Sequence, residues 1–235
     1  MKKENIYHGF RHSGEIISHT VWLYFRFTLS FRDVEEILAY RGIEVSYESI
    51  RRWCYHFGQD YSKKIRAKQG QAGDTWYLDE VFIKIKGKLH YLWRAVDQDG
   101  DTLDILVQSR KNKKAAERFF RKLLKGLKYS PNKIVTDKLK SYGAAHREMR
   151  LSAVHETGQY QNNRAENSHQ RTRQQERQMR RFKSAGHAQK FLSVHGAINN
   201  LSRQDRHLLS ASSYRTLRNI GFDELNKVSG LVPVN

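Results

Sequence analysis

Apolar positions in residues 15–57 recur at the three-and-four spacing of amphipathic helices. This spacing predicts three short helices, near residues 15–27, after Ser30 and after Ser46. Ser30 with Asp33 three residues later is typical of a capping box, and Gly42 is expected to end the second helix. Ser46 is the expected N-cap of the third helix. The N-terminal region is therefore predicted to be all-α.

The second and third predicted helices have the outline of a helix-turn-helix, in which the last helix enters the major groove of DNA. The third helix, residues 46–57, is expected to leave Arg51 and Arg52 pointing outward. The alternative is a three-helix packing module with a solvated basic face. We favour DNA binding. Residues 58–73 are polar and are predicted to be a linker.

From Thr75 the apolar spacing changes to two, which is the period of a β-strand. Three strands separated by turns at Gly87-Lys88 and Asp99-Gly100 predict an antiparallel meander. The later predicted elements are a helix at 112–127, a strand at 133–136, a short helix at 141–150, a candidate strand at 152–155 and a helix from Arg164 to about Arg203 with a candidate break at 184–186. Because a helix separates the third and fourth strands, we expect the fourth to run parallel to a meander strand in one mixed sheet.

Charge and cysteine usage narrow the class of protein. The chain has 235 residues, with 43 Lys and Arg against 24 Asp and Glu, which gives a formal net charge of +19. This basic excess favours a polyanionic partner, most often nucleic acid, because binding to phosphates releases condensed counterions. Cys54 is the single cysteine, which excludes an internal disulfide and a cysteine-based zinc site and indicates a reducing compartment. Without a long apolar run or a secretory signal, we expect a soluble, cytoplasmic protein with no membrane span.

Three carboxylates stand at positions where a charge needs a physical reason. Asp79 lies in the middle of an apolar strand, where an unpaired carboxylate is unfavourable. Asp137 ends the short strand at 133–136, and ligands gather at the carboxyl ends of such strands. Glu166 lies near the first turn of an arginine-rich helix. Two alternatives stay open: Asp137 as a cap of the next helix, and Glu166 as an ion-pair partner on a solvated face.

Oxygen donors from a strand centre, a strand end and a helix start suit Mg²⁺ or Mn²⁺, which are hard cations that prefer carboxylate and water. Two such ions about 4 Å apart would clamp the attacking and leaving oxygens of a phosphodiester. Glu80 is interpreted as exposed charge, and His169 as a surface or supporting group. Glu176 is the rival to Glu166, but we expect it to pair with neighbouring arginines. A glycine-rich phosphate loop and a nucleophile-elbow pattern are both missing from the sequence.

Five segments, taken in order, resemble one known family. They are Trp76-Tyr77-Leu78-Asp79-Glu80-Val81-Phe82-Ile83-Lys84, Tyr91-Leu92-Trp93-Arg94-Ala95-Val96-Asp97, Ser109-Arg110-Lys111-Asn112-Lys113-Lys114-Ala115-Ala116, Thr136-Asp137-Lys138 and Asn162-Asn163-Arg164-Ala165-Glu166-Asn167-Ser168-His169. With these segments the chain resembles a DDE transposase of the insertion sequence 6 family, with a ribonuclease H-like catalytic core. The resemblance covers nearly the whole chain. The segment between Asp137 and Glu166 is several residues shorter than is usual in that family.

The resemblance implies an α/β fold, with a ribonuclease H-like mixed five-stranded sheet flanked by helices and preceded by an all-α helix-turn-helix domain. It implies that Asp79, Asp137 and Glu166 are the catalytic acids and hold Mg²⁺ or Mn²⁺, with two ions in each active site. Arg173, seven residues after Glu166, would occupy the basic position on the DNA-facing side of its helix. Phosphate contacts are expected from Arg164, Arg171, Arg173, Arg177, Arg180 and Arg181, and recognition of the terminal inverted repeats from Tyr47, Arg51 and Arg52.

The implied reaction is DNA transposition by phosphoryl transfer. Water first cleaves the end of the element, and the freed 3′ hydroxyl then attacks target DNA. The partners would be double-stranded DNA, both inverted repeats and target, and a second copy of the chain in a homodimer or higher assembly, located in the cytoplasm at the nucleoid. The alternatives are a metal-dependent nuclease of the same fold without strand transfer and a non-catalytic DNA-binding derivative.

Three regions follow from this interpretation. Residues 1–70 are the expected helix-turn-helix DNA-binding domain with its linker, residues 71–209 the catalytic domain, and residues 210–235 a C-terminal tail. The tail has few sequence signals, so it is given no predicted element.

Overall fold

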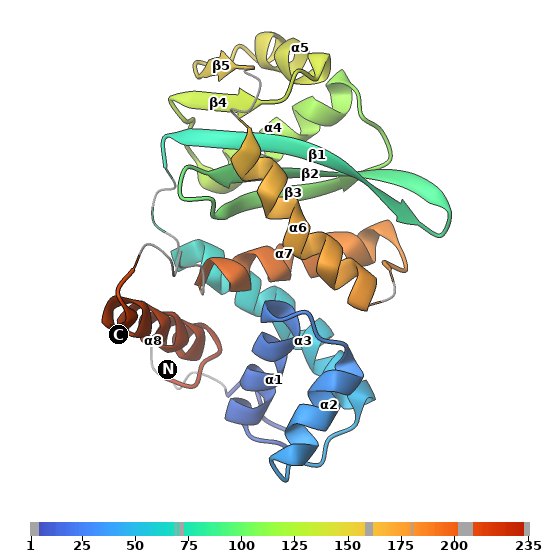
Figure 1. Cartoon of the computed structure of the whole chain (residues 1–235), viewed down its shortest axis with the longest axis vertical. Helices are drawn as coiled ribbons and strands as arrows, with labels where there is room; N and C mark the ends of the chain where they lie inside the picture. Colours follow the sequence, from blue (N-terminus) through green and yellow to red (C-terminus); the bar gives the residue numbers. More distant parts are fainter. Residues whose placement is uncertain are drawn as a thin grey trace. The chain divides into compact units, whose positions relative to one another are not determined.

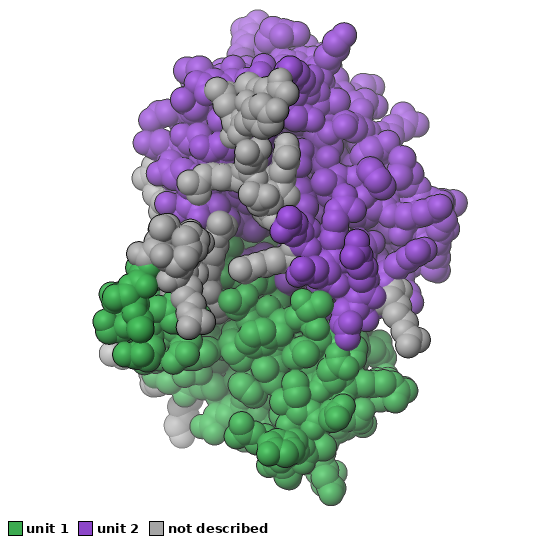
Figure 2. Space-filling model, in the orientation of Figure 1, with its two compact units in different colours: residues 1–68, 197–235 green, residues 69–196 purple. Residues whose placement is uncertain are grey.

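The computed structural model describes residues 5–68, 70, 73–157, 162–179, 181–201 and 209–232. The chain divides into two compact units, residues 1–68 with 197–235 and residues 69–196 (Figure 2). The C-terminal segment thus groups with the N-terminal helices. Within the described ranges, no helix has the length and apolar character that crossing a membrane requires.

The first unit contains the three predicted N-terminal helices, α1 (Gly14–Arg26), α2 (Phe31–Tyr40) and α3 (Tyr47–Lys68). The capping box of α2 is confirmed: the Ser30 hydroxyl accepts a hydrogen bond from the Asp33 backbone N–H, and the Asp33 carboxylate accepts one from the Ser30 N–H. Gly42, with φ at 72°, adopts the left-handed conformation just after α2. The turn between α2 and α3 is therefore built as the sequence predicts.

Helix α3 is longer than the sequence indicates, and the predicted linker at 58–73 is wrong over residues 58–68. Gly58 and the polar residues around it make this segment resemble a linker, although it carries apolar residues at helical spacing. Phe57, Tyr61 and Ile65, four residues apart, are all buried. The Tyr61 hydroxyl lies 2.5 Å from that of Tyr7, which donates to the Ser229 carbonyl at 2.7 Å. These contacts explain why the helix continues.

The C-terminal tail, which had no predicted element, forms α8 (Ala211–Val228). Ser210 caps the helix by accepting from the Ser213 N–H. Leu225 and Val228 are buried, so this half of α8 adds to the core of the first unit. The backbone of α8 also approaches the end of α7 (Ala185–Leu201) closely at Gly221.

Gly221→Ala is expected to lower the thermal unfolding midpoint by roughly 5 °C. A Cβ at this position would lie 2.3 Å from the Leu201 carbonyl oxygen, and overpacking against backbone costs about 1–3 kcal/mol. Gly126→Ala is the matched control, because nothing lies within 4 Å of its new Cβ and alanine favours the helix by about 0.5–1 kcal/mol. Calorimetry should therefore give shifts of opposite sign. A raised midpoint for Gly221→Ala would contradict the close approach.

The second unit is built on a five-stranded sheet in the order β3-β2-β1-β4-β5. The strands are β1 (Thr75–Ile85), β2 (Lys88–Asp97), β3 (Thr102–Gln108), β4 (Lys133–Thr136) and β5 (Val154–Glu156). The first three strands form the predicted antiparallel meander. Strand β4 runs parallel to β1, as the helical crossover predicts, and β5 runs parallel to β4. The expected mixed five-stranded sheet flanked by helices is thus confirmed.

Two layers of helix cover the sheet (Figure 1). Helices α4 (Lys113–Leu127) and α5 (Lys140–Glu148) cover one face, while α6 (Asn163–Gln178) crosses the other, where it contacts β1 and β2. The core under α4 and α5 is dominated by aromatic side chains, including Trp76, Trp93, Phe119, Phe120 and Tyr142. This packing fixes the position of the strand ends on which the acidic residues lie.

The long C-terminal helix predicted from Arg164 is interrupted earlier than the expected break at 184–186. Helix α6 ends at Gln178 and α7 begins at Ala185. Arg181, between them, has φ at 69°, the left-handed region that terminates helices. Helix α7 then covers the edge strand β3, since the Gln189 side chain accepts from the Val107 N–H and donates to the Ile105 carbonyl.

Candidate metal centre

The register of the two parallel strands brings Asp79 and Asp137 together. The last paired residues of β1 and β4 are Leu78 and Thr136, and each is followed directly by one of the acids. The two carboxylates therefore emerge side by side at the end of β4. One Asp137 oxygen accepts a hydrogen bond from the Leu139 N–H at 3.0 Å, so this residue also shapes the loop before α5.

A third carboxylate, Glu80, joins this pair. One oxygen from each of Asp79, Glu80 and Asp137 lies within 4.8 Å of the other two. The interpretation of Glu80 as exposed charge is wrong, because only 7% of the residue is exposed. Its Oε1 lies 2.5 Å from the ammonium group of Lys111, which follows β3. Sequence alternation places Glu80 on the sheet face opposite to Asp79, and the core packing of that face buries it.

Burial raises the pKa of two of these acids, and the charge of a neighbouring acid adds to each rise. Burial raises the pKa of Glu80 to about 7, and the Asp137 charge adds to the rise, whereas the Lys111 contact opposes it. Burial is also the main cause of the raised pKa of Asp137, and the negative charge of Asp79 raises it further. A divalent cation would offset the mutual repulsion of carboxylates held this close together. The oxygen-only donor set fits a hard divalent ion.

On the other face of β1, two buried residues lie beside Asp79. Arg94 is its direct neighbour in the register of β1 and β2, and only 3% of Arg94 is exposed. Burial lowers the pKa of Arg94 to about 10, while the Asp79 charge opposes that fall, so the guanidinium stays protonated at neutral pH. His169 of α6 has its Nε2 3.3 Å from Asp79 Oδ2. Burial lowers the pKa of His169 to about 4, which keeps the imidazole neutral.

The same contacts attach α6 to the sheet. The Arg94 guanidinium donates to the Thr172 hydroxyl at 2.5 Å, and the Asn162 amide donates to the Leu78 carbonyl at 2.8 Å. Asn162 precedes the helix, and the carbonyl it reaches belongs to the residue before Asp79. Helix α6 is therefore anchored to β1 beside the carboxylate cluster by the residue that precedes it, Asn162, and again by His169.

The structure brings together two of the three predicted catalytic acids and does not describe the side chain of the third. Asp79 and Asp137 lie together, as expected. Glu166 lies in the first turns of α6, and its side chain is outside the described part of the structure. The rival, Glu176, is half-buried further along α6. Burial raises its pKa, and the positive charges of Arg173, Arg181 and Arg177 oppose that rise.

The basic residues predicted to contact phosphate are only partly described. Arg173, Arg177 and Arg181 are exposed. The Arg173 guanidinium lies 5.7 Å from the centre of the Phe82 ring on β1. Arg180 and the side chains of Arg164 and Arg171 lie outside the described residues.

The predicted recognition residues lie on the first turns of α3. Arg52 is the most accessible, with 75% of its side chain exposed. Arg51 is held by Glu48, with its Nη2 at 2.5 Å from Oε1. Tyr47 is exposed, and the Arg32 guanidinium lies 4.5 Å from its ring centre. Arg52 is therefore the least restrained of the three side chains, since its Nε approaches Glu48 Oε1 only to 3.9 Å.

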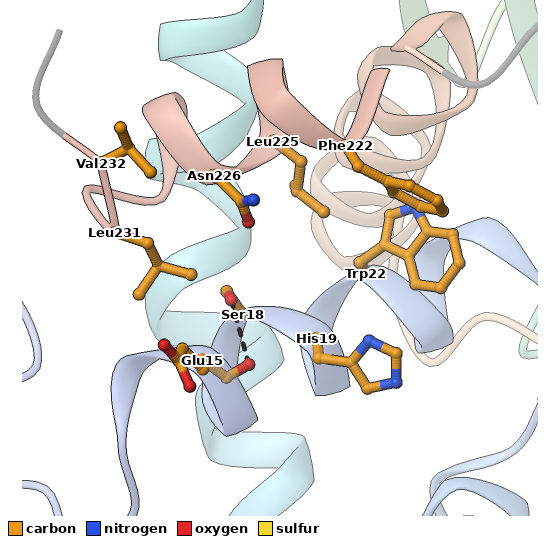
Figure 3. Close-up of a pocket in the computed structure, with 9 residues that line it drawn as sticks. All are labelled: Glu15, Ser18, His19, Trp22, Phe222, Leu225, Asn226, Leu231 and Val232. Carbon is orange, nitrogen blue, oxygen red and sulfur yellow. Dashed lines mark hydrogen bonds between the residues drawn. The ribbon is translucent and has the colours of Figure 1, made fainter. Parts of the chain in front are cut away.

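A separate pocket lies in the first unit between α1 and α8 (Figure 3). Its lining is mainly apolar, with the rings of Trp22 and Phe222 edge to face at 5.4 Å. Glu15 contributes its single carboxylate. This lining lacks the gathered oxygen ligands of the acidic cluster, so it offers no second site for a divalent ion.

Sequence reasoning missed the supporting residues Glu80, Lys111 and Arg94, and it left His169 as either a surface or a supporting group. A signal existed for Arg94, and another favoured the supporting role of His169. Arg94 is a lone charge inside an apolar strand, the same anomaly that singled out Asp79, and His169 follows Glu166 by three residues on one helix face. The burial of Glu80 and its contact with Lys111 depend on the packing of α4 and α5, which no local pattern reveals.

Similarity to known proteins extends over almost the entire sequence. A family profile described as a DDE domain matches residues 73–205. The chain is 31% identical over 221 residues to the transposase for insertion sequence-like element IS431mec of Staphylococcus aureus, covering 92% of this chain and 93% of that protein. It is 30% identical, with the same coverage, to the transposase for insertion sequence element IS257 in transposon Tn4003 of Staphylococcus aureus.

Solved structures with a similar backbone include the HTLV-2 integrase catalytic core domain in complex with magnesium. That likeness has a TM-score of 0.43 at 14% identity and covers 61% of this chain and 94% of that chain. The simian T-cell lymphotropic virus intasome in complex with PP2A regulatory subunit B56 gamma also has a TM-score of 0.43, at 17% identity, and the likeness covers 59% of this chain and 51% of that chain.

Proposed function

This chain belongs to the insertion sequence 6 family of DDE transposases, and on that premise we propose that Asp79, Asp137 and Glu166 are its catalytic acids. As a member of that family it is an insertion-sequence transposase, a polynucleotidyl transferase with a ribonuclease H-like core. The observation that carries the site proposal is the adjacency of Asp79 and Asp137 at the paired ends of β1 and β4.

The position of Glu166 on α6 supports its role as the third acid. Positions 162, 166 and 169 share one helix face, because they are four and three residues apart. Asn162 contacts the Leu78 carbonyl and His169 contacts Asp79, so that face of α6 is directed at the cluster. Glu176 lies ten residues beyond Glu166, about 15 Å further along the helix axis, which disfavours it as a ligand.

The carboxylates of Asp79 and Asp137, with that of Glu166, would hold Mg²⁺ or Mn²⁺. Divalent ions held there, two in our proposal, would polarise the scissile phosphate and lower the pKa of the attacking hydroxyl. Glu80 has Lys111 as its charge partner, so we assign it to holding the strand ends rather than to the triad. His169 and Arg94 orient the Asp79 carboxylate from the α6 side.

The substrate of this site is double-stranded DNA at the terminal inverted repeats and then target DNA. The arginines around and after Glu166, on and beyond α6, bind phosphates and align the strand; these are Arg164, Arg171, Arg173, Arg177, Arg180 and Arg181. Cleavage exposes a 3′ hydroxyl, which attacks a target phosphodiester in a second displacement. Joining two ends needs two active sites, so we propose a homodimer or higher assembly on DNA.

Recognition of the inverted repeats is assigned to the start of α3, where Tyr47, Arg51 and Arg52 lie. Arg52→Ala is expected to weaken specific end binding about tenfold, because a bidentate base contact contributes about 1–3 kcal/mol. Arg51→Ala should have a smaller effect, since Glu48 already neutralises Arg51. Lys64→Ala, further along α3, is the control. Fluorescence anisotropy with specific and scrambled DNA measures the effect, and an unchanged affinity of Arg52→Ala for end DNA would leave the three helices as a packing module.

Asp137→Asn is expected to raise the unfolding midpoint of the metal-free protein by roughly 2–4 °C, because it removes repulsion among carboxylates within 4.8 Å. Mg²⁺ should raise the midpoint of the wild type but not of the variant, since ligand binding stabilises the folded state. Asp99→Asn, at an exposed turn, is the control. It should have the wild-type unfolding midpoint without metal and the wild-type rise with Mg²⁺. Equal Mg²⁺ responses in wild type and Asp137→Asn would argue against a metal at these carboxylates.

The reaction is tested by incubating the protein with Mg²⁺, labelled inverted-repeat DNA and an unlabelled target. A transposase gives a cleaved end and a joined product that carries the label. Cleavage without joining would identify the protein as a nuclease of the same fold. Binding without cleavage would identify it as a non-catalytic DNA-binding derivative.

A further inference from the structure

The hairpin formed by β1 and β2 extends beyond the other strands (Figure 1). The pairing of β1 with β4 ends at Leu78, and the pairing of β2 with β3 begins at Tyr91. Residues 83–90 therefore have only each other as strand partners among the described residues. At the tip, Lys86 and Gly87 have φ of 48° and 80°, the two left-handed residues of a type I′ turn. The predicted turn at Gly87-Lys88 is thus shifted by one residue. We call residues 82–90 the ribbon.

The ribbon has one buried and one exposed side. Ile83 and Ile85 are almost completely buried, and this holds the ribbon in place. Phe82 is 61% exposed, and Lys84, Lys86 and Lys88 are exposed as well. The sequence of the ribbon contains no acidic residue. Lys88 is paired with Ile85 and so lies on the side of the isoleucines, whereas Lys84 shares the side of Phe82 and Lys86 lies at the turn. The free side therefore combines an open aromatic ring with the positive charges of Lys84 and Lys86, which complements a nucleic-acid strand.

Phe82 also lies close to the proposed active site. It follows Asp79 by three residues on β1, which corresponds to about 10 Å, and by alternation it lies on the strand face of Glu80, another member of the acidic cluster. Arg173, whose guanidinium lies 5.7 Å from the ring centre, follows His169 by four residues on α6, and His169 contacts Asp79. The Phe82 ring is thus three residues from Asp79 along β1, and Arg173 is one helical turn from His169 along α6. This distance is about three base steps of DNA.

We propose that Phe82, with Arg173 beside its ring, is a stacking platform for an unpaired base within about three nucleotides of the bond that is cut. The base must be unpaired, because a base inside the duplex has both faces covered by its neighbours. Lys84 and Lys86 hold the phosphates of the same strand. Isolated exposed aromatic residues are common on proteins. This one differs because a cation, an acid-free basic ribbon and the cluster of acids all lie beside it. The inference rests on the proposed transposase reaction and adds to it a DNA distortion that the protein stabilises.

The platform is tested by the rate of end cleavage on fully paired inverted-repeat DNA. Phe82→Ala should cut this DNA about tenfold more slowly than the wild type, because stacking on an aromatic ring is lost. Phe82→Trp, which keeps an aromatic face, should stay within about twofold of the wild type. Val154→Ala is the matched control, because Val154 is an apolar strand residue with 60% exposure at the far edge of the sheet. It should cut at the wild-type rate.

A second DNA, mismatched at the nucleotides that flank the cleaved bond, separates the platform from a general loss of fold. Because its bases are already unpaired, it should reduce the tenfold defect of Phe82→Ala to about threefold or less. In parallel, a 2-aminopurine placed at the flanking position should change its fluorescence on binding to wild type but not to Phe82→Ala. Equal cleavage of paired DNA by Phe82→Ala and wild type would overturn the platform and leave the transposase proposal intact. Absence of cleavage by the wild type would overturn both.

Discussion

Glu166→Gln is expected to reduce strand cleavage and strand transfer by about three orders of magnitude while DNA binding persists. The amide keeps the size of the carboxylate but removes the negative charge that holds a divalent ion. Asp79→Asn and Asp137→Asn should have the same effect, because their carboxylates are adjacent at the paired ends of β1 and β4. Product yield from labelled end DNA and anisotropy on the same DNA measure the two properties separately.

Two other glutamates serve as controls for this result. Glu176→Gln should keep nearly full activity, because Glu176 lies among arginines far along α6. Glu80→Gln should lose roughly tenfold, since Glu80 supports the strand ends through Lys111 but is not assigned to the triad. Full activity in Glu166→Gln together with loss in either control would move the third catalytic acid to that residue.

Arg94→Met is expected to lower the free energy of unfolding by about 3 kcal/mol, which corresponds to roughly 6–12 °C in the unfolding midpoint. Arg94 is buried opposite Asp79 and donates to Thr172, so its removal leaves a buried carboxylate without its cation and detaches α6 from β2. Denaturant unfolding in the presence of a chelator measures this loss without a contribution from bound metal.

The double variant Asp79→Asn/Arg94→Met separates charge pairing from packing. Removing both charges should restore about 1–2 kcal/mol relative to Arg94→Met, because no unpaired carboxylate is left in the sheet. If the two single effects simply add, Arg94 does not stabilise Asp79, and the position of the carboxylate is determined by His169 and the backbone instead.

The sheet and its two aspartates could be predicted from the sequence because each leaves a local signal. Alternation from Thr75 onward indicates a strand, and the apolar run before Asp137 indicates a buried parallel one. Once a crossover helix separates them, parallel pairing brings the two strand ends to one edge. The capping pair Ser30 and Asp33 is local in the same way, because a side chain and a backbone group three residues apart decide it.

Features that depend on distant packing could not be predicted in this way. Helix α3 continues past Gly58 because Tyr61 meets Tyr7, which is 54 residues earlier in the sequence. Helix α8 is stabilised by a core that the N-terminal helices build. Glu80 is buried by the packing of α4 and α5, and its partner Lys111 follows another strand. In each case the deciding contact joins segments far apart in the chain.

The position of the metal in crystals of the protein with inverted-repeat DNA and Mn²⁺ tests the central claim most directly. Anomalous scattering from Mn²⁺ identifies the ion and its ligands without relying on activity. We predict Mn²⁺ coordinated by carboxylate oxygens of Asp79, Asp137 and Glu166, with the cleaved phosphate beside it. Coordination by Asp79, Glu80 and Asp137 with Glu166 turned away, or Mn²⁺ bound only elsewhere, would contradict the assignment of the catalytic triad.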